Sequence, residues 1–181
     1  NQRKPLDDVR VRRAIAAAID RKSVIDGAVD GFGVPIGSYY TPGAPGYVDL
    51  TAVNAYDPAK ARALLHQAGV QLPLELTMKL PPTPYARQGG EIIAAMLDKV
   101  GIKAKMENIE WAQWLSGVYK DKAYDLTVIA HVEPLDFGNF ARPGYYWNYD
   151  SAQFNALWAK IQATAQAGER NQLMGEAQRL V

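Results

Sequence analysis

The sequence of 181 residues contains no cysteine and only two histidines, His66 and His131. Without thiols the chain has no disulfides, no cysteine nucleophile and no cysteine-ligated metal site. It also lacks an apolar run of about 18 residues, the length that a membrane-spanning helix requires. The formal net charge is only +1, and Lys and Arg residues are scattered along the chain. Nucleic acid is therefore not an expected partner.

Recognised catalytic motifs are also missing. The sequence contains no HExxH, GxSxG or GxxxxGK[ST] pattern, which excludes the commonest zinc-protease, serine-hydrolase and phosphate-binding loops. A metal site would have to combine His131 with Glu133 and Asp136 from a single stretch, and that spacing is unspecific. We therefore expect no enzyme, no metal site and no cofactor.

The middle of the chain alternates between two hydrophobic periods. Leu74–Leu80 and Ile102–Ile109 alternate apolar and polar residues, which is typical of strands. Between them, Ile92–Val100 has its apolar residues at helical spacing, and a second helical stretch precedes the apolar run Tyr124–Ala130. Strands that alternate with helices in this way predict an α/β fold with a central, mostly parallel sheet and flanking helices.

Two further helices have clear terminal signals. Asp57 is placed as an N-cap, Pro58 occupies the first helical position, and Gly69 follows the last turn. Ser151 is predicted to cap another helix, and a break near Gly168 separates that helix from the last one.

Parallel strands end at the same edge of a sheet, and open α/β sheets bind their ligands outside that edge. We therefore expect three loops to share one rim: 81–85, 108–114 and 131–147. The third loop is dense in polar and aromatic residues, which suggests ligand recognition. The predicted ligand-binding residues are His131, Glu133, Asp136, Asn139, Arg142, Tyr145 and Tyr146 from that loop and Trp111 from the second. The alternative is that the aromatic residues only complete the core.

The charges of the third loop suit a ligand that carries both signs. Glu133 and Asp136 could grip a cationic group, and Arg142 could bind a carboxylate through two parallel hydrogen bonds. Trp111 and Trp114 lie three residues apart on one predicted helix, and Trp111 is nearer the strand end. We therefore predict Trp111 at the pocket and Trp114 in the core.

The irregular segment Gly33–Ala55 contains three prolines and several tyrosines. We interpret it as a structural strap on the surface. The alternative is that the segment supplies part of a pocket wall, in which Tyr39 or Tyr40 contacts the ligand.

Three stretches carry phrases that recur in one protein family. Pro5–Arg21 (PLDDVRVRRAIAAAIDR) matches the phrase DvrVRrAi–AiDr, and Tyr56–Gly69 (YDPAKARALLHQAG) matches yDPekAkaLLaeAG. Ser151–Val181 contains a closing phrase of the type eR–ly–eaq. In these stretches the chain resembles the second lobe of the extracellular solute-binding proteins of ABC transporters, family 5, the dipeptide/oligopeptide-binding type. The resemblance covers essentially all 181 residues.

The resemblance implies a periplasmic-binding-protein-like (type II) clamp, of which residues 1–181 form a single α/β lobe. It further implies a fragment of a longer protein, whose first lobe is missing here. Its implied location is the periplasm or the outer cell surface, and its implied partners are a small-molecule solute and an ABC permease in the membrane. The solute would be a peptide, an opine-like conjugate or a similar compound.

One departure from the family pattern bears on the solute. Peptide-binding relatives often carry an Asp after the last strand that grips the amino end of the peptide, and here Ala130 occupies that place. Glu133 or Asp136 could replace it. Two other functions stay open: a small α/β hydrolase that uses His131 with a loop carboxylate, and a non-catalytic protein-interaction domain.

Overall fold

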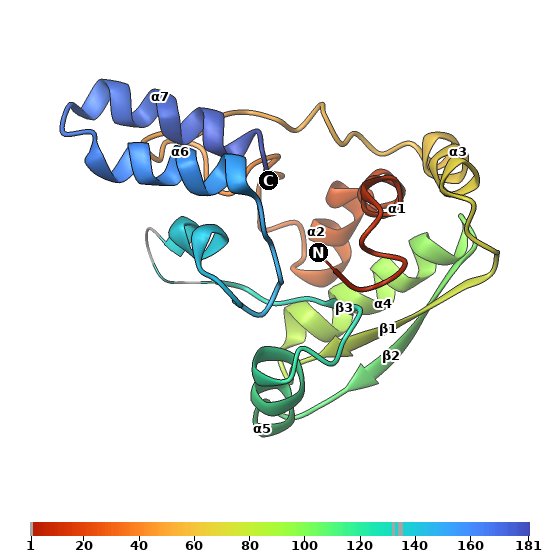
Figure 1. Cartoon of the computed structure of the whole chain (residues 1–181). Coiled ribbons are helices and arrows are strands. Elements are labelled where there is room, and N and C mark those ends of the chain that lie inside the picture. The colour runs from red at the N-terminus through yellow and green to blue at the C-terminus, as the bar shows by residue number, and fades with distance from the viewer. Residues whose placement is uncertain (1, 132, 134–135) are drawn as a thin grey trace. The chain divides into compact units, whose positions relative to one another are not determined.

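The computed structural model describes residues 2–131, 133 and 136–181. The chain divides into two compact units (Figure 1). Unit 1 comprises Asn1–Pro35 and Ala55–Ala130, and unit 2 comprises Ile36–Asn54 and His131–Val181. Among the described residues, no helix is both long and apolar enough to span a membrane.

Unit 1 contains a three-stranded parallel sheet with the strand order β2-β1-β3. Strand β1 spans Leu74–Leu80 and β2 spans Ile102–Asn108, and their register pairs Leu74 with Ile102 and Leu80 with Asn108. The predicted parallel sheet is thereby confirmed. The alternation of β1 also places Leu76, Met78 and Leu80 in the core.

The third strand is much shorter than the sequence predicts. The run Tyr124–Ala130 was expected to form one continuous strand, but β3 contains only Leu126–Thr127. Side chains take the hydrogen bonds that a longer backbone ladder would make: the Asp125 carboxylate accepts from the Thr77 N–H at 2.8 Å, and the Thr127 hydroxyl donates to the Lys79 carbonyl at 2.7 Å.

Helices surround this sheet and bury an aliphatic core. They are α1 (Val9–Ala18), α2 (Arg21–Ala28), α3 (Pro58–Ala68), α4 (Pro84–Asp98), the short α5 (Trp111–Gln113) and the π-helix η1 (Trp114–Lys120). Helix α4 packs against β1 and β2, α2 packs against α4, and α1 packs against α3 (Figure 1). The core residues of this unit are Leu, Val, Ala, Met and Ile side chains.

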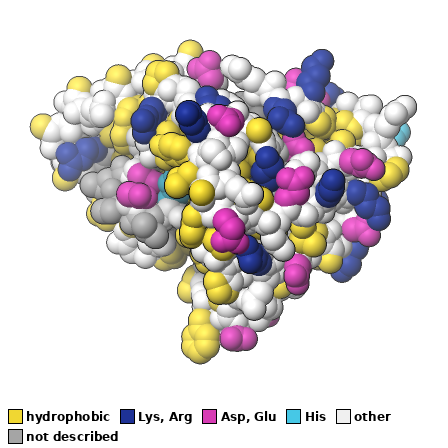
Figure 2. Space-filling model, turned by 90° about the horizontal axis from the view of Figure 1, so that it is seen from below, with side chains coloured by type: hydrophobic (Ala, Val, Ile, Leu, Met, Phe, Trp, Pro, Cys, Tyr) yellow, Lys and Arg dark blue, Asp and Glu magenta, His cyan; other side chains and the backbone are white. Residues whose placement is uncertain are grey.

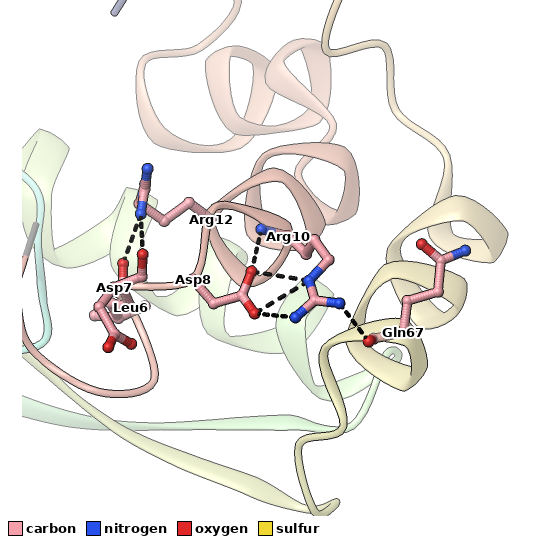
Figure 3. A network of polar contacts seen from close by, with 6 residues as sticks. All are labelled: Leu6, Asp7, Asp8, Arg10, Arg12 and Gln67. Atoms are coloured by element: carbon pink, nitrogen blue, oxygen red, sulfur yellow. Dashed lines mark hydrogen bonds and ion pairs between the residues drawn. The ribbon is translucent and has the colours of Figure 1, made fainter.

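The ends of these helices are fixed by side chains. Asp57 caps α3 by accepting from the Lys60 N–H at 2.9 Å, and Gly69 ends the helix with a φ of 69°, as the sequence predicts. Asp8 caps α1 and also binds the Arg10 guanidinium, which reaches the Gln67 carbonyl at the end of α3 at 2.7 Å (Figure 3). The hydrogen bonds from Arg10 lower the pKa of the Asp8 carboxyl.

The described residues of unit 2 form two α-helices and one short 3₁₀ helix. These are α6 (Ala152–Ala163), α7 (Ala167–Gln178) and η2 (Asp136–Ala141), and α6 packs against both of the others. Ser151 caps α6 as predicted, through the Phe154 N–H at 3.2 Å. The predicted break near Gly168 lies a few residues earlier: α6 ends before Thr164, and the Gln166 side chain caps α7 so that Gly168 lies in its first turn.

The core of unit 2 combines aromatic rings with aliphatic side chains of α6 and α7. Phe137 and Phe154 are fully buried and meet edge-on with ring centroids 5.4 Å apart. The irregular segment 36–54 is fastened to this core, since Gln178 of α7 accepts from the Tyr40 N–H at 3.1 Å and donates to the Gly46 carbonyl. The segment acts as the predicted strap within unit 2, and it also carries tyrosines into the aromatic core.

Candidate functional site

In unit 1, the first two predicted rim loops follow strands that end at the same edge of the sheet. The two strands β1 and β2 run parallel to their last residues, Leu80 and Asn108, and the Ile109 N–H continues the pairing by donating to the Leu80 carbonyl at 3.0 Å. The loop after β1 leads into α4, and the loop after β2 leads into α5. Polar groups from both loops therefore gather at one edge of the sheet.

Two of these polar groups are buried without a hydrogen-bond partner among the described residues. The Thr83 hydroxyl, just before α4, and the Arg87 Nε, one turn into α4, make no hydrogen bond within the described part of the chain. The Nη2 nitrogen of Arg87 contacts the Glu110 carboxylate at 3.2 Å and the Ile109 carbonyl at 3.5 Å. The sequence analysis missed Arg87, although its place one turn beyond the loop after β1 was a usable signal.

The tryptophan pair at this edge is divided as the sequence predicts. Trp114 is only 5% exposed, and its indole N–H donates to the Thr127 hydroxyl at 3.1 Å. Trp111 lies edge-on to it at 6.0 Å and is 43% exposed. Trp111 therefore has a ring face available for contact, and its role in binding stays a prediction.

In unit 2, a chain of hydrogen bonds runs through the third predicted loop. The Tyr39 hydroxyl donates to Asp136 Oδ1 at 2.6 Å, and Asp136 Oδ2 lies 2.7 Å from His131 Nδ1. On the other side of the ring, His131 Nε2 lies 2.7 Å from the Tyr146 hydroxyl. We call these four residues the clasp. It joins the strap to the loop, which are far apart in sequence.

The chemistry of the clasp follows from what each group can donate. A carboxylate only accepts, so Asp136 receives hydrogen bonds from both Tyr39 and His131 Nδ1. Nε2 then accepts from the Tyr146 hydroxyl in the neutral ring and donates to it in the protonated ring. Burial and the hydrogen bond to Asp136 raise the pKa of Tyr39. Burial, with Asp136 nearby, raises the pKa of Tyr40 to about 12.

Aromatic rings and one cation surround the clasp. The His131 ring lies 5.3 Å from Trp147 and 6.4 Å from Tyr145. The Arg142 guanidinium lies over the Tyr145 ring at 5.3 Å, a cation–π contact. Arg142 is exposed and forms no ion pair with any described residue, while Asn139 is half-buried and its carbonyl accepts from the Arg142 N–H at 3.1 Å.

The same loop holds the residues that could bind a metal ion. One ligand atom each from His131, Glu133 and Asp136 lies within 4.8 Å of the others. A nitrogen and two carboxylate oxygens suit several divalent cations, but a cation would have to replace the hydrogen bond between His131 and Asp136. The expectation of no metal therefore stays a prediction.

The predicted residues thus fall into two groups. His131, Asp136, Tyr145 and Tyr146 lie together in unit 2, whereas Trp111 belongs to unit 1. The expectation that loop 131–147 shares one rim with the other two loops therefore stays a prediction. Val132, Pro134 and Leu135 of that loop lie outside the described residues.

Other surface features offer less chemistry. A shallow depression of about 450 Å³ in unit 1 is lined by Lys4, Pro5, Asp7, Asp8, Ala68 and Val70. Its Asp8 carboxylate is already occupied by Arg10 (Figure 3). On the face drawn in Figure 2, basic and acidic side chains of the described residues are mixed, without a continuous field of one sign.

Comparison with known proteins places the chain in a family. Residues 1–165 match the family described as bacterial extracellular solute-binding proteins, family 5 Middle. The Dipeptide-binding protein of Escherichia coli (strain K12) is 37% identical over 119 residues, which make up 63% of this chain and 22% of that protein.

Two solved structures show the same fold. The dipeptide binding protein from Pseudoalteromonas sp. SM9913, in complex with Met-Leu, has a TM-score of 0.88 at 22% identity, and the match covers 99% of this chain and 38% of that one. The PBP AgaA from A. tumefaciens R10, in complex with agropinic acid, has a TM-score of 0.85 at 27% identity, with 98% and 39% covered.

The chain thus spans less than two-fifths of the length of these relatives. The relatives are solute-binding proteins and not enzymes, which speaks against the hydrolase alternative. With a family match over 165 of its 181 residues, this chain belongs to the bacterial extracellular solute-binding proteins of family 5.

Proposed function

We propose that this chain is part of the solute-binding component of an ABC importer. The whole protein would capture a peptide or peptide-like solute between two lobes and deliver it to a membrane permease. Family membership supports this function, as do relatives named for dipeptide binding and a related structure that holds agropinic acid. Closure of two lobes around the solute would exclude water and use the binding energy to bring the lobes together.

One observation carries the proposal most directly. At the edge where β1 and β2 end, Thr83 and Arg87 each have a buried polar atom without a partner among the described residues. Native proteins rarely leave such atoms unsatisfied, because each costs about 1–3 kcal/mol. A solute that offers a carboxylate or carbonyl at this edge would supply the missing acceptors, and Arg87 has the planar geometry that carboxylates prefer.

The loop of unit 2 adds groups of both signs. Arg142 is exposed and oriented by the Tyr145 ring, and Glu133 is exposed on the same loop. Such a pair suits a zwitterionic or anionic solute, and the exposed ring of Trp111 suits an apolar side chain. We propose that all eight predicted residues, together with Arg87, form the solute-binding site, either by contacting the solute or by holding the contacting residues in place.

The location and partners follow from the same proposal. The protein would work in the periplasm or at the outer cell surface, with an ABC permease and the other lobe of its own chain as partners. It would need no cofactor, because capture and release require only reversible contacts.

A thermal-shift screen of the full two-lobe protein tests the function. The panel consists of di- and oligopeptides, agropinic acid, saccharides and nickel chelates. A solute at 100 times its Kd adds about 2.7 kcal/mol of stability, so one class should raise the Tm by several degrees. No shift with any class would contradict the proposal.

Matched variants test the residues. Arg87→Ala and Arg142→Ala should each weaken binding at least tenfold, because each removes a guanidinium that faces the solute. Arg62→Ala in unit 1 and Arg170→Ala in unit 2 are controls, since both residues are exposed. If the control variants lost as much solute affinity, the effect would come from the overall charge of the protein and not from these two positions. The chain of 181 residues alone should bind weakly, and a submicromolar Kd for it would contradict the two-lobe mechanism.

An exposed apolar stripe supports a second candidate function, a protein-interaction surface. Trp111, Leu115 and Tyr119 recur every four residues along α5 and η1 and are 43%, 54% and 39% exposed. If this surface binds another protein, the chain should self-associate at high concentration, and Leu115→Ser should reduce that association in sedimentation velocity. A monomer at all concentrations would count against this candidate.

A further inference from the structure

We propose that Asp136 is a positioning residue, which holds His131 and the ligand loop in place, and not the carboxylate that grips the amino group of a solute. This inference rests on the proposed solute-binding function. The sequence presents two loop carboxylates, Glu133 and Asp136, as equivalent candidates for that contact, and the inference removes Asp136 from them.

Both carboxylate oxygens of Asp136 already take part in hydrogen bonds within the clasp. Oδ1 accepts from Tyr39 at 2.6 Å, and Oδ2 binds His131 Nδ1 at 2.7 Å. The Asp136 side chain is only 10% exposed, so little of it faces solvent. A solute ammonium would have to reach this largely buried carboxylate and compete with these charge-assisted hydrogen bonds, which are about twice as strong as neutral ones.

The clasp extends through the histidine ring. Nε2 of His131 meets the Tyr146 hydroxyl at 2.7 Å, and Tyr146 is only 4% exposed. Both ring nitrogens are therefore engaged, and the ring cannot rotate without losing two hydrogen bonds. The ring is the natural anchor for Tyr145 and Trp147, whose rings lie beside it.

The clasp also fixes the loop from outside. Tyr39 is 97 residues away from Asp136 in sequence, and its ring also packs on Phe137 at 5.2 Å and on Phe140 at 5.4 Å. The strap thus holds the loop by packing and by a hydrogen bond at once. A loop that is ordered before the solute arrives loses less entropy on binding, which raises affinity without a direct contact.

The proposal has a consequence for the solute. If Asp136 is committed to the clasp, the solute's amino group must be held by another residue or be absent. A blocked amino end, as in N-acetyl-Met-Leu, should then bind with the same dependence on Asp136 as Met-Leu does.

Two substitutions at one position separate positioning from charge. In Asp136→Asn, the amide oxygen still accepts from Tyr39, but the amide NH₂ can only donate to His131 Nδ1. The proton must then move to Nε2, which donates to the Tyr146 oxygen. The clasp is retained with the histidine tautomer reversed, and only the negative charge is lost. Asp136→Ala removes the clasp altogether.

The tautomer can be measured without any solute. The chain of 181 residues has only two histidines, and His66 is exposed on α3 and serves as the internal reference. With ¹⁵N-labelled histidine, NMR should show His131 protonated at Nδ1 in the wild type and at Nε2 in Asp136→Asn. In Asp136→Ala, the His131 signals should resemble those of His66. Unchanged His131 signals in Asp136→Ala would overturn the proposal.

The affinity of the full two-lobe protein for Met-Leu and N-acetyl-Met-Leu gives the second readout. Asp136→Ala should weaken binding of either probe about tenfold or more, and Asp136→Asn should restore it to within about threefold of the wild type. Tyr39→Phe removes only the hydrogen bond from Tyr39 to Asp136, so its affinity should lie between those of the two Asp136 variants. Asp136→Asn could instead fold with the reversed His131 tautomer and still bind the probes as weakly as Asp136→Ala. That result would mean that the negative charge of Asp136 interacts directly with the solute, and it would overturn the proposal.

A different result separates this inference from the proposed function. If neither probe binds the wild type, peptide capture is contradicted, while the NMR result still decides whether Asp136 positions His131. If both probes bind but Asp136→Ala has no effect on affinity, solute capture stands and the positioning role is wrong.

Discussion

The two units stabilise themselves with different kinds of core. Unit 1 buries Leu, Val, Ala, Met and Ile side chains between a parallel sheet and its helices. Unit 2 has no strand among its described residues and packs aromatic rings, with Phe137 and Phe154 at its centre, together with aliphatic side chains of α6 and α7. An aliphatic core needs many side chains that point the same way, which regular elements supply. Aromatic rings bury about 150–250 Å² each, so a few of them can fill the interior between irregular segments.

This difference explains why loop 131–147 belongs to unit 2. Its described residues contain no regular element apart from η2, so they cannot contribute a periodic apolar face. The loop is held through its rings: Phe140 stacks on Trp147 at 4.7 Å, and Phe137 meets Trp158 of α6 at 5.9 Å. Gly138 makes room for that contact, since a Cβ atom there would lie 2.6 Å from the Trp158 ring.

The largest expected effect is the loss of the central ring of unit 2. Phe137 is fully buried and contacts five other rings. Phe137→Ala should lower the free energy of unfolding by about 3–5 kcal/mol. Leu97→Ala, at a fully buried site of unit 1, should cost about 2–5 kcal/mol. Urea unfolding measures the loss of stability in both variants, and hydrogen exchange shows residue by residue where it occurs.

The comparison predicts where each loss appears. Phe137→Ala should increase exchange first in α6 and α7, and Leu97→Ala should do so first in α4 and β1. If either variant loosened the two sets of elements equally, the two cores would not be separate sources of stability.

Regular elements were predictable from the sequence because their signals are local. The period of two in Leu74–Leu80 gives the bounds of β1, and Asp57, Pro58 and Gly69 mark α3. The run Tyr124–Ala130 misled for a physical reason: its apolar composition is that of a buried strand, but the side chains of Asp125 and Thr127 replace the ladder.

The site was predictable only in part. The exposure of Trp111 and the burial of Trp114 followed from helical spacing and the nearby strand end. The clasp could not be predicted, because nothing local links Tyr39 to a carboxylate 97 residues later. The position of Arg87 one turn beyond the loop after β1 was a signal, but only the placement of α4 against the sheet edge shows that its Nε has no partner among the described residues.

An intermediate effect should separate two neighbouring tyrosines of unit 2. Tyr39→Phe removes a donor to Asp136 and should cost about 1–3 kcal/mol, the usual penalty when a partner of a buried charged group is lost. Tyr40→Phe removes a buried hydroxyl that has no partner among the described residues, so it should be neutral or slightly stabilising. Thermal unfolding of the two variants checks the sign, and a costly Tyr40→Phe would contradict the assignment.

Alkaline pH sharpens the same contrast across the two units. Burial raises the pKa of Tyr40 in unit 2 and of Tyr124 in unit 1 to about 12, whereas tyrosine in the unfolded chain titrates near 10. The folded state therefore favours the neutral phenol, and this contribution is complete below pH 10 and declines as the pH rises towards 12. Tyr40→Phe and Tyr124→Phe should each flatten the loss of stability in that window, and unchanged pH curves would refute the role of burial.

The smallest expected effect concerns the helix caps, which should not distinguish the units. Asp57 accepts from the Lys60 N–H at 2.9 Å in unit 1, and Ser151 accepts from the Phe154 N–H at 3.2 Å in unit 2. Replacing either residue by Ala should cost about 1 kcal/mol, with Asp57 slightly ahead because its charge also interacts with the helix dipole. His66→Ala, at an exposed site of α3, is the control and should change stability little. If the two cap variants lose similar stability while the two core variants lose different amounts, the difference between the units lies in their cores. A Ser151→Ala loss several times that of Asp57→Ala would instead show that unit 2 depends on the ends of its helices as much as on its rings.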